Sequence, residues 1–363
     1  MKVLHINVGA ENGGGKTHII SLLSQFNSNE AELLVLEDGI VAQEARALNI
    51  KVTVIPQTSR YDLSVLKKII VFINKNNFDL VHTHGPRANF LINKIRNKLN
   101  AKWVITVHSN PKLDFMNRGL KGKLFTFLNL KCLKKADALI AVTENFKKML
   151  IEYGLNEKNI YVVYNGIIFD DTPIKKRNKN SIFTMSYVAR LHPIKGHSLL
   201  FKSLSKTNIP NYKLNIIGDG DCLSQLKKEA SELKIDSFIH FLGFKNREEI
   251  DQLVSESDIT LLSSYSESFP LVLLESANQH VPFISTAVGD VHKLIPNEKY
   301  GWLVPIDNQL AYTKALDDAY RSWLDDTLIA KGENIYKLAS TNFSLDKLYQ
   351  DTKKIYLDVL RKE

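Results

Sequence analysis

Apolar and polar positions follow a repeating rhythm along the chain. A short apolar run rich in β-branched residues is followed by a longer stretch with apolar residues at helical spacing, such as "DLSVLKKIIVFINKNN" and "CLSQLKKEASELK". This alternation predicts parallel sheets joined by crossover helices, an α/β fold. The predicted strands cover residues 2–8, 32–36, 51–56, 80–84, 103–108, 138–142, 161–166, 183–190, 213–220, 238–244, 259–264 and 282–289.

The rhythm stops and restarts around one polar, charged segment, "FDDTPIKKRNKNS" at residues 169–181. Such a segment is typical of a linker, and a length of 363 residues also favours two domains. Residues 343–360 have apolar positions at helical spacing and predict a terminal amphipathic helix. We therefore expect two doubly wound, Rossmann-like domains at residues 1–168 and 169–345, followed by a helix at 346–363.

Ligands of open parallel sheets bind at loops after the carboxyl ends of strands. The first such loop, "AENGGGKTH", fits a relaxed phosphate-binding pattern from Ala10 to Thr17, which raises the hypothesis of an ATPase or kinase. That chemistry needs an acidic magnesium ligand at the end of a nearby strand. The neighbouring strands end in histidine, and Glu144 is out of pattern. The glycines therefore favour a different phosphate ligand.

The loop "SESFPLVLLES" in the second half predicts a phosphate site at a helix start. We expect Pro270 at the first helical position, which leaves the amides of Leu271 and Val272 unsatisfied and able to bind a phosphate. Glu275, about one turn into the helix, can accept hydrogen bonds from a ribose. Glu267 can do the same for a sugar ring.

Two cations lie upstream, in "VARLHPIKG". Arg190 and Lys195 can hold a diphosphate, the arginine through its planar fork and the lysine as a point charge. Gly218 and Gly220 form a tight turn between a strand and a helix, and this turn can equally be architectural.

The histidines and cysteines do not predict a metal site. We expect His82 and His84, at one strand end, to point to opposite faces and to make a poor chelating pair. His108 follows a buried-looking strand and is either a site residue or a core or capping histidine. Cys132 and Cys222 lie far apart, without a CxxC pattern.

The net charge of +9 is carried by residues 1–170, where 23 Lys and Arg stand against 14 Asp and Glu. Within this half, "RGLKGKLFTFLNLKCLKK" suits either an anionic membrane surface or a helix with a solvated lysine face. No nucleic-acid reader motif is present. The first apolar run indicates a strand and not a signal peptide, and no apolar stretch approaches about 18 residues. We expect a cytoplasmic protein, with contact to the inner face of the membrane as a hypothesis.

The order of "VARLHPIKG", "IIGDG", "FLGF" and "SESFPLVLLESANQHVPFISTAVG" resembles retaining nucleotide-sugar glycosyltransferases of the GT-B fold, glycosyltransferase family four. "GGGKTH", "DLVHTHGPRANF", "TVHS" and "VVYNGI" in the first half are similar to that family as well. Asp290, Lys293 and Ser268 depart from the family pattern of glycine, glutamate and glycine.

The resemblance implies that the terminal helix at residues 346–363 crosses back to the first domain. It also implies transfer of a hexose or N-acetylhexosamine from a nucleoside diphosphate sugar, with UDP favoured over GDP. The acceptor would be a glycan, a lipid-linked sugar or a cell-surface polymer bound by the first domain, and neither a metal nor a cofactor is needed. The alternatives are a P-loop ATPase or kinase that uses the loop from Ala10 to Thr17, and a non-catalytic nucleotide-sugar-binding protein. The implied catalytic residues are His108, Arg190, Lys195 and Glu267; the donor-binding residues are Gly14, Gly15, Arg190, Lys195, Gly218, Phe269, Pro270, Leu271, Val272 and Glu275; the acceptor-side residues are Lys16, His18 and His84.

Overall fold

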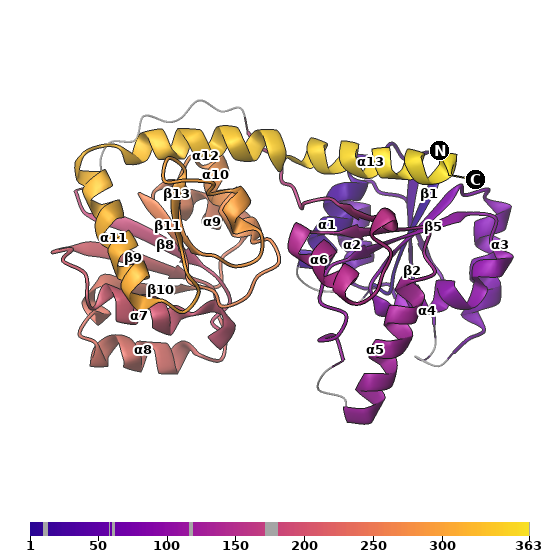
Figure 1. Cartoon of the computed structure of the whole chain (residues 1–363), viewed down its shortest axis with the longest axis horizontal. Coiled ribbons are helices and arrows are strands. Elements are labelled where there is room, and N and C mark those ends of the chain that lie inside the picture. Colours follow the sequence, from indigo (N-terminus) through magenta and orange to yellow (C-terminus); the bar gives the residue numbers. More distant parts are fainter. Residues whose placement is uncertain (10–13, 58, 60–61, 116–118, 171–180, 363) are drawn as a thin grey trace. The chain divides into compact units, whose positions relative to one another are not determined.

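The computed structural model of the chain consists of two compact units (Figure 1). It describes residues 1–9, 14–57, 59, 62–115, 119–170 and 181–362. Unit 1 comprises Met1–Gly166 together with Leu345–Glu363, and unit 2 comprises Ile167–Ser344. The sequence placed the divisions after residues 168 and 345. No helix in the described part of the chain is long and apolar enough to cross a membrane.

Unit 1 is built on a seven-stranded parallel sheet in the order β3-β2-β1-β4-β5-β6-β7. The apolar runs form the strands because both faces of the sheet are covered by helices. The strands are β1 (Val3–Asn7), β2 (Ala31–Val35), β3 (Val52–Val54), β4 (Leu80–His84), β5 (Lys102–Val107), β6 (Ala138–Ala141) and β7 (Ile160–Val162). The helices are α1 (Gly14–Leu23), α2 (Ile40–Ala47), α3 (Val65–Lys75), α4 (Pro86–Ile95), α5 (Gly119–Leu133), α6 (Glu144–Glu152) and α13 (Leu345–Arg361).

Unit 2 repeats this plan with a six-stranded parallel sheet in the order β10-β9-β8-β11-β12-β13. The strand order reverses between β8 and β11, which is where open sheets of this type bind ligands. The strands are β8 (Phe183–Val188), β9 (Tyr212–Ile217), β10 (Ile239–Gly243), β11 (Ile259–Leu262), β12 (Phe283–Thr286) and β13 (Gly301–Val304). The helices are α7 (His197–Leu204), α8 (Leu223–Glu232), α9 (Arg247–Ser255), α10 (Leu271–Asn278), α11 (Gln309–Leu324) and α12 (Leu328–Asn342).

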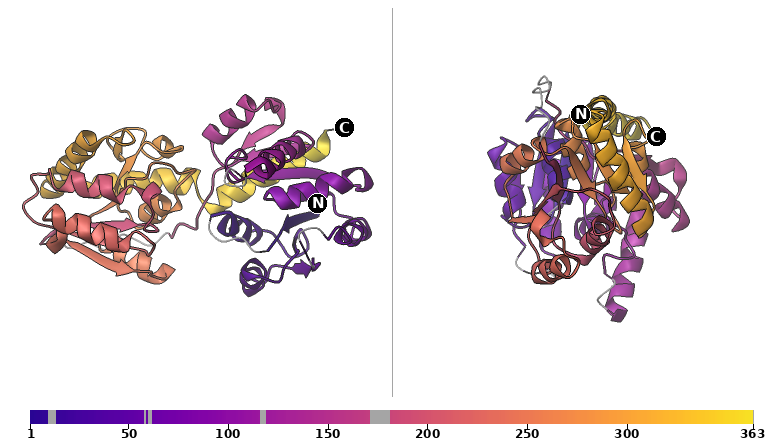
Figure 2. Two further views of the ribbon diagram at one scale, coloured as in Figure 1. Left: turned by 90° about the horizontal axis from the view of Figure 1, so that it is seen from below. Right: turned by 90° about the vertical axis from the view of Figure 1, so that its left-hand side faces the viewer.

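The terminal helix α13 packs on unit 1, although it follows all of unit 2 in the chain. Its apolar residues Leu348, Ile355 and Val359 are buried in the same core as Val3 and Ile19. In Figure 1 and in the left view of Figure 2 the helix runs along the sheet and α1. This packing brings Tyr356 into the centre of unit 1.

All twelve predicted strands are confirmed, and two parallel Rossmann-like sheets confirm the predicted fold class. The sequence missed one strand, the edge strand β13. This strand has only four residues and begins with Gly301, whose φ of +150° lets its backbone approach Phe283 closely. Its three apolar residues, Trp302 to Val304, lie between Gly301 and Pro305, two residue types that usually mark turns.

Candidate active site

The predicted donor residues of unit 2 lie on loops at one edge of its sheet. Arg190 and Lys195 follow β8, Gly218 follows β9, and Glu267 follows β11. Because all strands are parallel, the carboxyl ends of these strands meet at the same edge. The loops after β8 and β11 adjoin, since β8 and β11 pair directly.

Lys195 and Glu267 form an ion pair across these adjacent loops. The Nζ of Lys195 lies 2.5 Å from Oε1 of Glu267, and the hydroxyl of Ser264 donates to the same oxygen at 2.8 Å. The side chains are 23% and 15% exposed, so a ligand can reach both. The sequence predicted the lysine and the glutamate as site residues, but it gave no sign that they contact each other or that Ser264 orients Glu267.

Arg190 is exposed at the end of β8, and none of the described acidic side chains forms an ion pair with it. The backbone around it is fixed by glycine. Gly218 has a φ of +138°, and a Cβ there would lie 2.0 Å from the carbonyl oxygen of Ala189. Gly220 approaches the carbonyl oxygen of Leu191 in the same way. These glycines are therefore architectural: they let the loop of Arg190 lie against the turn after β9.

The start of α10 differs by one residue from the prediction. Pro270 is the N-cap residue, with φ −74° and ψ 108°, and Leu271 is the first helical residue. The amides of Leu271 and Val272 still lie in the first turn, where helices lack internal partners. Phe269 is 3% exposed, and its ring lies 4.9 Å from that of Phe343. Its side chain thus belongs to the core of unit 2.

Glu275, in the second turn of α10, is largely buried beside a cation. Its Oε1 lies 3.5 Å from Nη1 of Arg247 at the start of α9. Burial raises the pKa of Glu275, and the guanidinium of Arg247 opposes that effect. Arg247 had no sequence signal, because it occupies an ordinary charged helix start, "REEIDQL".

The histidines of unit 1 lie together, and here the sequence interpretation was wrong. His82 and His84 are two residues apart on β4, so they point to the same face of the sheet. Their ring centroids are 4.3 Å apart, and the ring of His5 on β1 lies 4.8 Å and 5.2 Å from them. His5 pairs with His82 in the register of the two strands.

Two further histidines extend this group. His108, directly after β5, has its Nε2 3.1 Å from Nδ1 of His84. His18 on α1 has its Nδ1 2.8 Å from Oδ1 of Asn165, and its ring centroid lies 4.8 Å from that of His108. The Nε2 of His18 is buried and has no hydrogen-bond partner among the described residues.

Burial keeps these histidines neutral near neutral pH. Desolvation lowers the pKa of His5 to about 3, with a smaller contribution from His18. It also lowers the pKa of His18 to about 4, against the hydrogen bond that His18 donates to Asn165. Desolvation, together with the neighbouring rings, also lowers the pKa of His82, His84 and His108 well below the usual value. The cluster offers hydrogen bonds and no stable positive charge.

Because His82 and His84 lie on the same face of the sheet, the argument that they make a poor chelating pair no longer holds. His5, His82 and His84 form one group of three nitrogen donors within 4.8 Å, and His18, His84 and His108 form another. In the first group all six ring nitrogens already have hydrogen-bond partners. A metal ion there would have to replace those bonds.

The glycine-rich loop is described only in part, because Ala10 to Gly13 lie outside the described residues. Gly14 and Gly15 begin α1. Lys16 forms a short ion pair with Glu44 on α2, and its side chain is 14% exposed. The lysine that a phosphate-binding loop would direct at a nucleotide is therefore engaged with a carboxylate.

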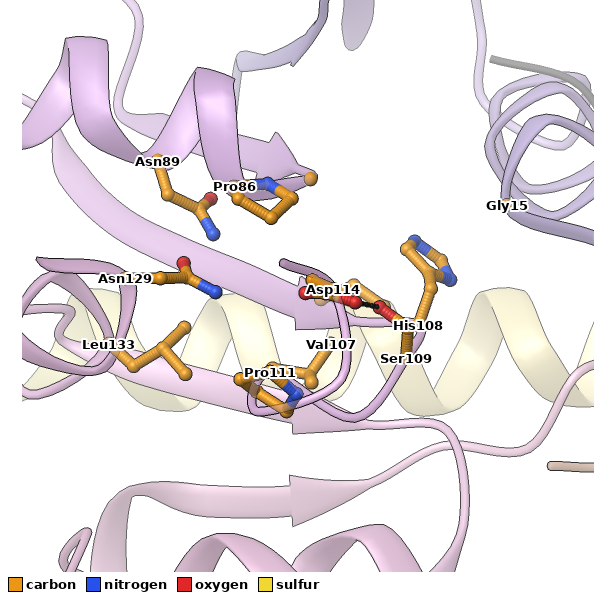
Figure 3. A pocket seen from close by; sticks show the side chains of 12 residues that line it. Gly15, Pro86, Asn89, Val107, His108, Ser109, Pro111, Asp114, Asn129 and Leu133 are labelled. Atoms are coloured by element: carbon orange, nitrogen blue, oxygen red, sulfur yellow. Dashed lines mark hydrogen bonds between the residues drawn. The ribbon is translucent and has the colours of Figure 1, made fainter. Parts of the chain in front are cut away.

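A pocket of about 260 Å³ opens in unit 1 beside His108 (Figure 3). Asn89 on α4 and Asn129 on α5 point into it from one side, and Asp114 faces them, held by a 2.6 Å hydrogen bond from Ser109. Both asparagines are more than nine-tenths buried, and Oδ1 of Asn129 has no described partner. Apolar walls come from Pro86, Val107, Pro111 and Leu133.

Comparison with known protein families shows to which family the chain belongs. The model of the family Glycosyltransferase Family 4 matches residues 12–171, and that of Glycosyl transferases group 1 matches residues 169–336. The chain belongs to glycosyltransferase family four. The first family model thus covers most of unit 1 of this glycosyltransferase, and the second covers most of unit 2.

Relatives and solved structures agree with this assignment. The chain is 25% identical to an uncharacterized 41.2 kDa protein in the cps region of Klebsiella pneumoniae, over 98% of this chain and 99% of that one. It is 24% identical to an Escherichia coli UDP-Gal:alpha-D-GlcNAc-diphosphoundecaprenol alpha-1,3-galactosyltransferase, over 82% and 80% of the two chains. Its fold matches Anabaena HepE in complex with UDP with a TM-score of 0.84, 18% identity and coverage of 99% and 100%. The glycosyltransferase has the GT-B fold.

Proposed function

We propose that this glycosyltransferase moves a hexose or N-acetylhexosamine from a nucleoside diphosphate sugar, UDP in preference to GDP, with retention of configuration and without a metal ion. The observation that carries the proposal is the meeting of Arg190, Lys195 and the start of α10 at the carboxyl edge of the unit 2 sheet. The negative charge that develops on a departing diphosphate needs fixed positive groups. Two cations and the free amides of a helix start supply them.

In this reaction the bond between the anomeric carbon and the diphosphate oxygen breaks, and the acceptor hydroxyl forms the new bond on the same face. The acceptor proton passes to the leaving phosphate oxygen, so atoms and charges balance without a further reagent. Glu267 binds the hydroxyls of the donor sugar, and its pairing with Lys195 and Ser264 holds the carboxylate in place. Glu275 binds the ribose.

We assign the unit 1 pocket beside His108 to a sugar of the acceptor. Its volume of about 260 Å³ suits a single ring with bound water, and its amide and carboxyl groups match hydroxyl partners. The unpartnered Oδ1 of Asn129 would accept a hydrogen bond from such a hydroxyl. The relative that acts on a diphosphoundecaprenol-linked sugar supports a glycan or lipid-linked acceptor.

A lipid-linked acceptor would require contact with a membrane, and α5 has a suitable surface. Leu120, Leu124 and Phe127 are 84%, 56% and 62% exposed and share one helix face, and Lys121 and Lys123 stand beside them. In Figure 1 the helix extends away from the sheet of unit 1. Apolar side chains flanked by lysines favour an anionic lipid surface.

The donor site is tested by thermal unfolding with UDP, GDP, ADP and ATP, each with and without magnesium. Ligand binding to the folded state raises the midpoint by mass action. We expect UDP to stabilise the wild type without magnesium and to lose most of this effect in Lys195→Ala. Lys213→Ala, at an exposed position of β9, is the matched control and should behave as the wild type.

Stabilisation by ATP alone, dependent on magnesium and unchanged in Lys195→Ala, would reject the donor site. The membrane contact is tested separately by sedimentation with phosphatidylglycerol vesicles at low salt. Leu124→Glu with Phe127→Glu should abolish binding, whereas Leu310→Glu, at an 81% exposed position of α11, should not. Equal binding of all three proteins would reject α5 as the contact.

A further inference from the structure

Six side chains of unit 1 form one continuous hydrogen-bonded chain that ends at His108. It connects β1, β4, β5 and α13 and includes the phenol of Tyr356, which is fully buried. The five contacts are His108 Nε2 to His84 Nδ1 at 3.1 Å, His84 Nε2 to His5 Nδ1 at 3.0 Å, His5 Nε2 to the hydroxyl of Tyr356 at 3.2 Å, that hydroxyl to His82 Nδ1 at 2.5 Å, and His82 Nε2 to Oγ1 of Thr106 at 2.7 Å.

A chain of neutral imidazoles has a direction. Each neutral ring carries one N–H and one bare nitrogen, so a ring that accepts on one side must donate on the other. The hydroxyl of Tyr356 likewise donates to one ring and accepts from the other. The whole chain therefore has two states without a broken bond, and the two differ in which nitrogen of His108 carries the proton.

The contacts of Tyr356 favour one of these states. Hydrogen bonds donated by hydroxyl groups are shorter than those donated by N–H groups. The 2.5 Å contact with His82 fits donation by the tyrosine hydroxyl, and the 3.2 Å contact with His5 fits donation by the imidazole to the tyrosine oxygen. The 2.7 Å contact of His82 with Thr106 lies in the range of both donor types and is compatible with this state. In this state His5 accepts from His84, which accepts from His108.

We infer that Tyr356 is a positioning residue that fixes His108, through His5 and His84, as the tautomer protonated on Nε2. The Nδ1 of His108 then carries a lone pair and accepts a hydrogen bond from a substrate hydroxyl. The tautomer follows from the hydrogen-bond chain alone, while the role toward a substrate rests on the proposed function. The terminal helix thus sets the hydrogen-bond polarity of a site residue 248 positions earlier in the chain.

The tautomer is measured by long-range ¹H–¹⁵N correlation NMR on the full chain labelled with ¹⁵N-histidine. Protonated and bare ring nitrogens have well separated shifts, and the spectrum of His108→Gln identifies the signals of His108. We expect Nε2 to be protonated in the wild type. In Tyr356→Phe both nitrogens should move to intermediate shifts, because the group that orders the chain is missing.

Tyr349→Phe is the matched control on the same helix. Tyr349 contacts Phe26 and Lys353 and takes no part in the hydrogen-bonded chain. Its spectrum at His108 should equal that of the wild type. Thr106→Val is a second variant at the far end: it removes the acceptor for His82 and should also shift His108 toward the other tautomer.

A wild-type His108 protonated on Nδ1 would overturn the inference, and so would wild-type shifts in both Tyr356→Phe and Thr106→Val. Activity adds a separate readout. We expect kcat/KM of Tyr356→Phe to fall about threefold to tenfold, as for one lost neutral hydrogen bond, with unchanged UDP binding. If the predicted tautomer is found but no sugar nucleotide is turned over, the proposed function fails and the hydrogen-bond inference stands.

Discussion

Substituting Gly218 by alanine places a methyl group where the backbone of the neighbouring loop already lies. The added Cβ would be 2.0 Å from the carbonyl oxygen of Ala189 and 2.9 Å from its carbonyl carbon, whereas ordinary contacts begin at 3.4 Å. Both are backbone atoms, so no side-chain rotation relieves the overlap. The φ of +138° adds strain of about 1–3 kcal/mol for a residue with a Cβ.

Together these effects should lower the free energy of unfolding of unit 2 by about 2–4 kcal/mol. For a domain of this size the expected loss in Tm is about 5–15 °C, measured by calorimetry and by urea unfolding. UDP affinity should fall as well. Ala189 directly precedes Arg190, so a displacement of the Ala189 backbone also displaces Arg190, which we propose binds the diphosphate. Neither effect depends on the identity of the sugar.

Gly14→Ala is the matched control, since both glycines were predicted to bind the donor. No described atom lies within 4 Å of a Cβ at Gly14, and the residue begins α1. Alanine there should change stability by less than about 1 kcal/mol. If Gly218→Ala proves as stable as Gly14→Ala, the close approach of the two loops is wrong.

Two further predictions concern the charges of the two units. Because burial depresses the pKa values of His5 and His18 to about 3 and about 4, their stabilising contribution is present above the unfolded value of 6.5 and is lost as the pH falls below it. Each of the two histidines should lower the free energy of unfolding by up to about 1.4 kcal/mol per pH unit between pH 6.5 and 5, measured by urea unfolding. A free energy of unfolding that does not change with pH in this range would contradict the burial of the two rings in their neutral form. Glu267→Gln should lower kcat about 10²-fold while changing UDP affinity less than about threefold, because UDP lacks the transferred sugar that Glu267 is proposed to hold. Glu232→Gln, on the exposed face of α8, is the control, and an equal loss of UDP binding and turnover in Glu267→Gln would show that Glu267 does not act on the sugar.

The fold could be predicted from sequence because each strand is an apolar run flanked by helical spacing, and that information is local. The donor loops could be placed as well, since parallel strands bring their carboxyl ends to one edge. The ion pairs at the site could not be predicted. Arg247 and Glu275, for example, meet through the packing of α9 on α10, and no residue near either one in the sequence indicates the other.

The histidine chain was beyond local reasoning for the same reason. His5 and Tyr356 are 351 positions apart, and they meet because α13 covers the sheet of unit 1. The error about His82 and His84 was one of strand periodicity, and the one-residue shift at Pro270 reflects how weakly a proline alone fixes a helix start.

The charged and neutral groups of the two units limit which group can accept the proton of the acceptor hydroxyl in the proposed transfer. In the proposal, Arg190 and Lys195 of unit 2 are the groups that stabilise the departing diphosphate. Unit 1 contributes His108, whose pKa is held well below the usual value by burial and by the neighbouring His18. A neutral imidazole of this kind accepts a hydrogen bond at neutral pH but does not hold a second proton. The diphosphate oxygen gains negative charge as its bond breaks, and it is therefore the stronger base of the two. In the proposed transfer His108 would therefore orient a hydroxyl, and the leaving phosphate would take the proton.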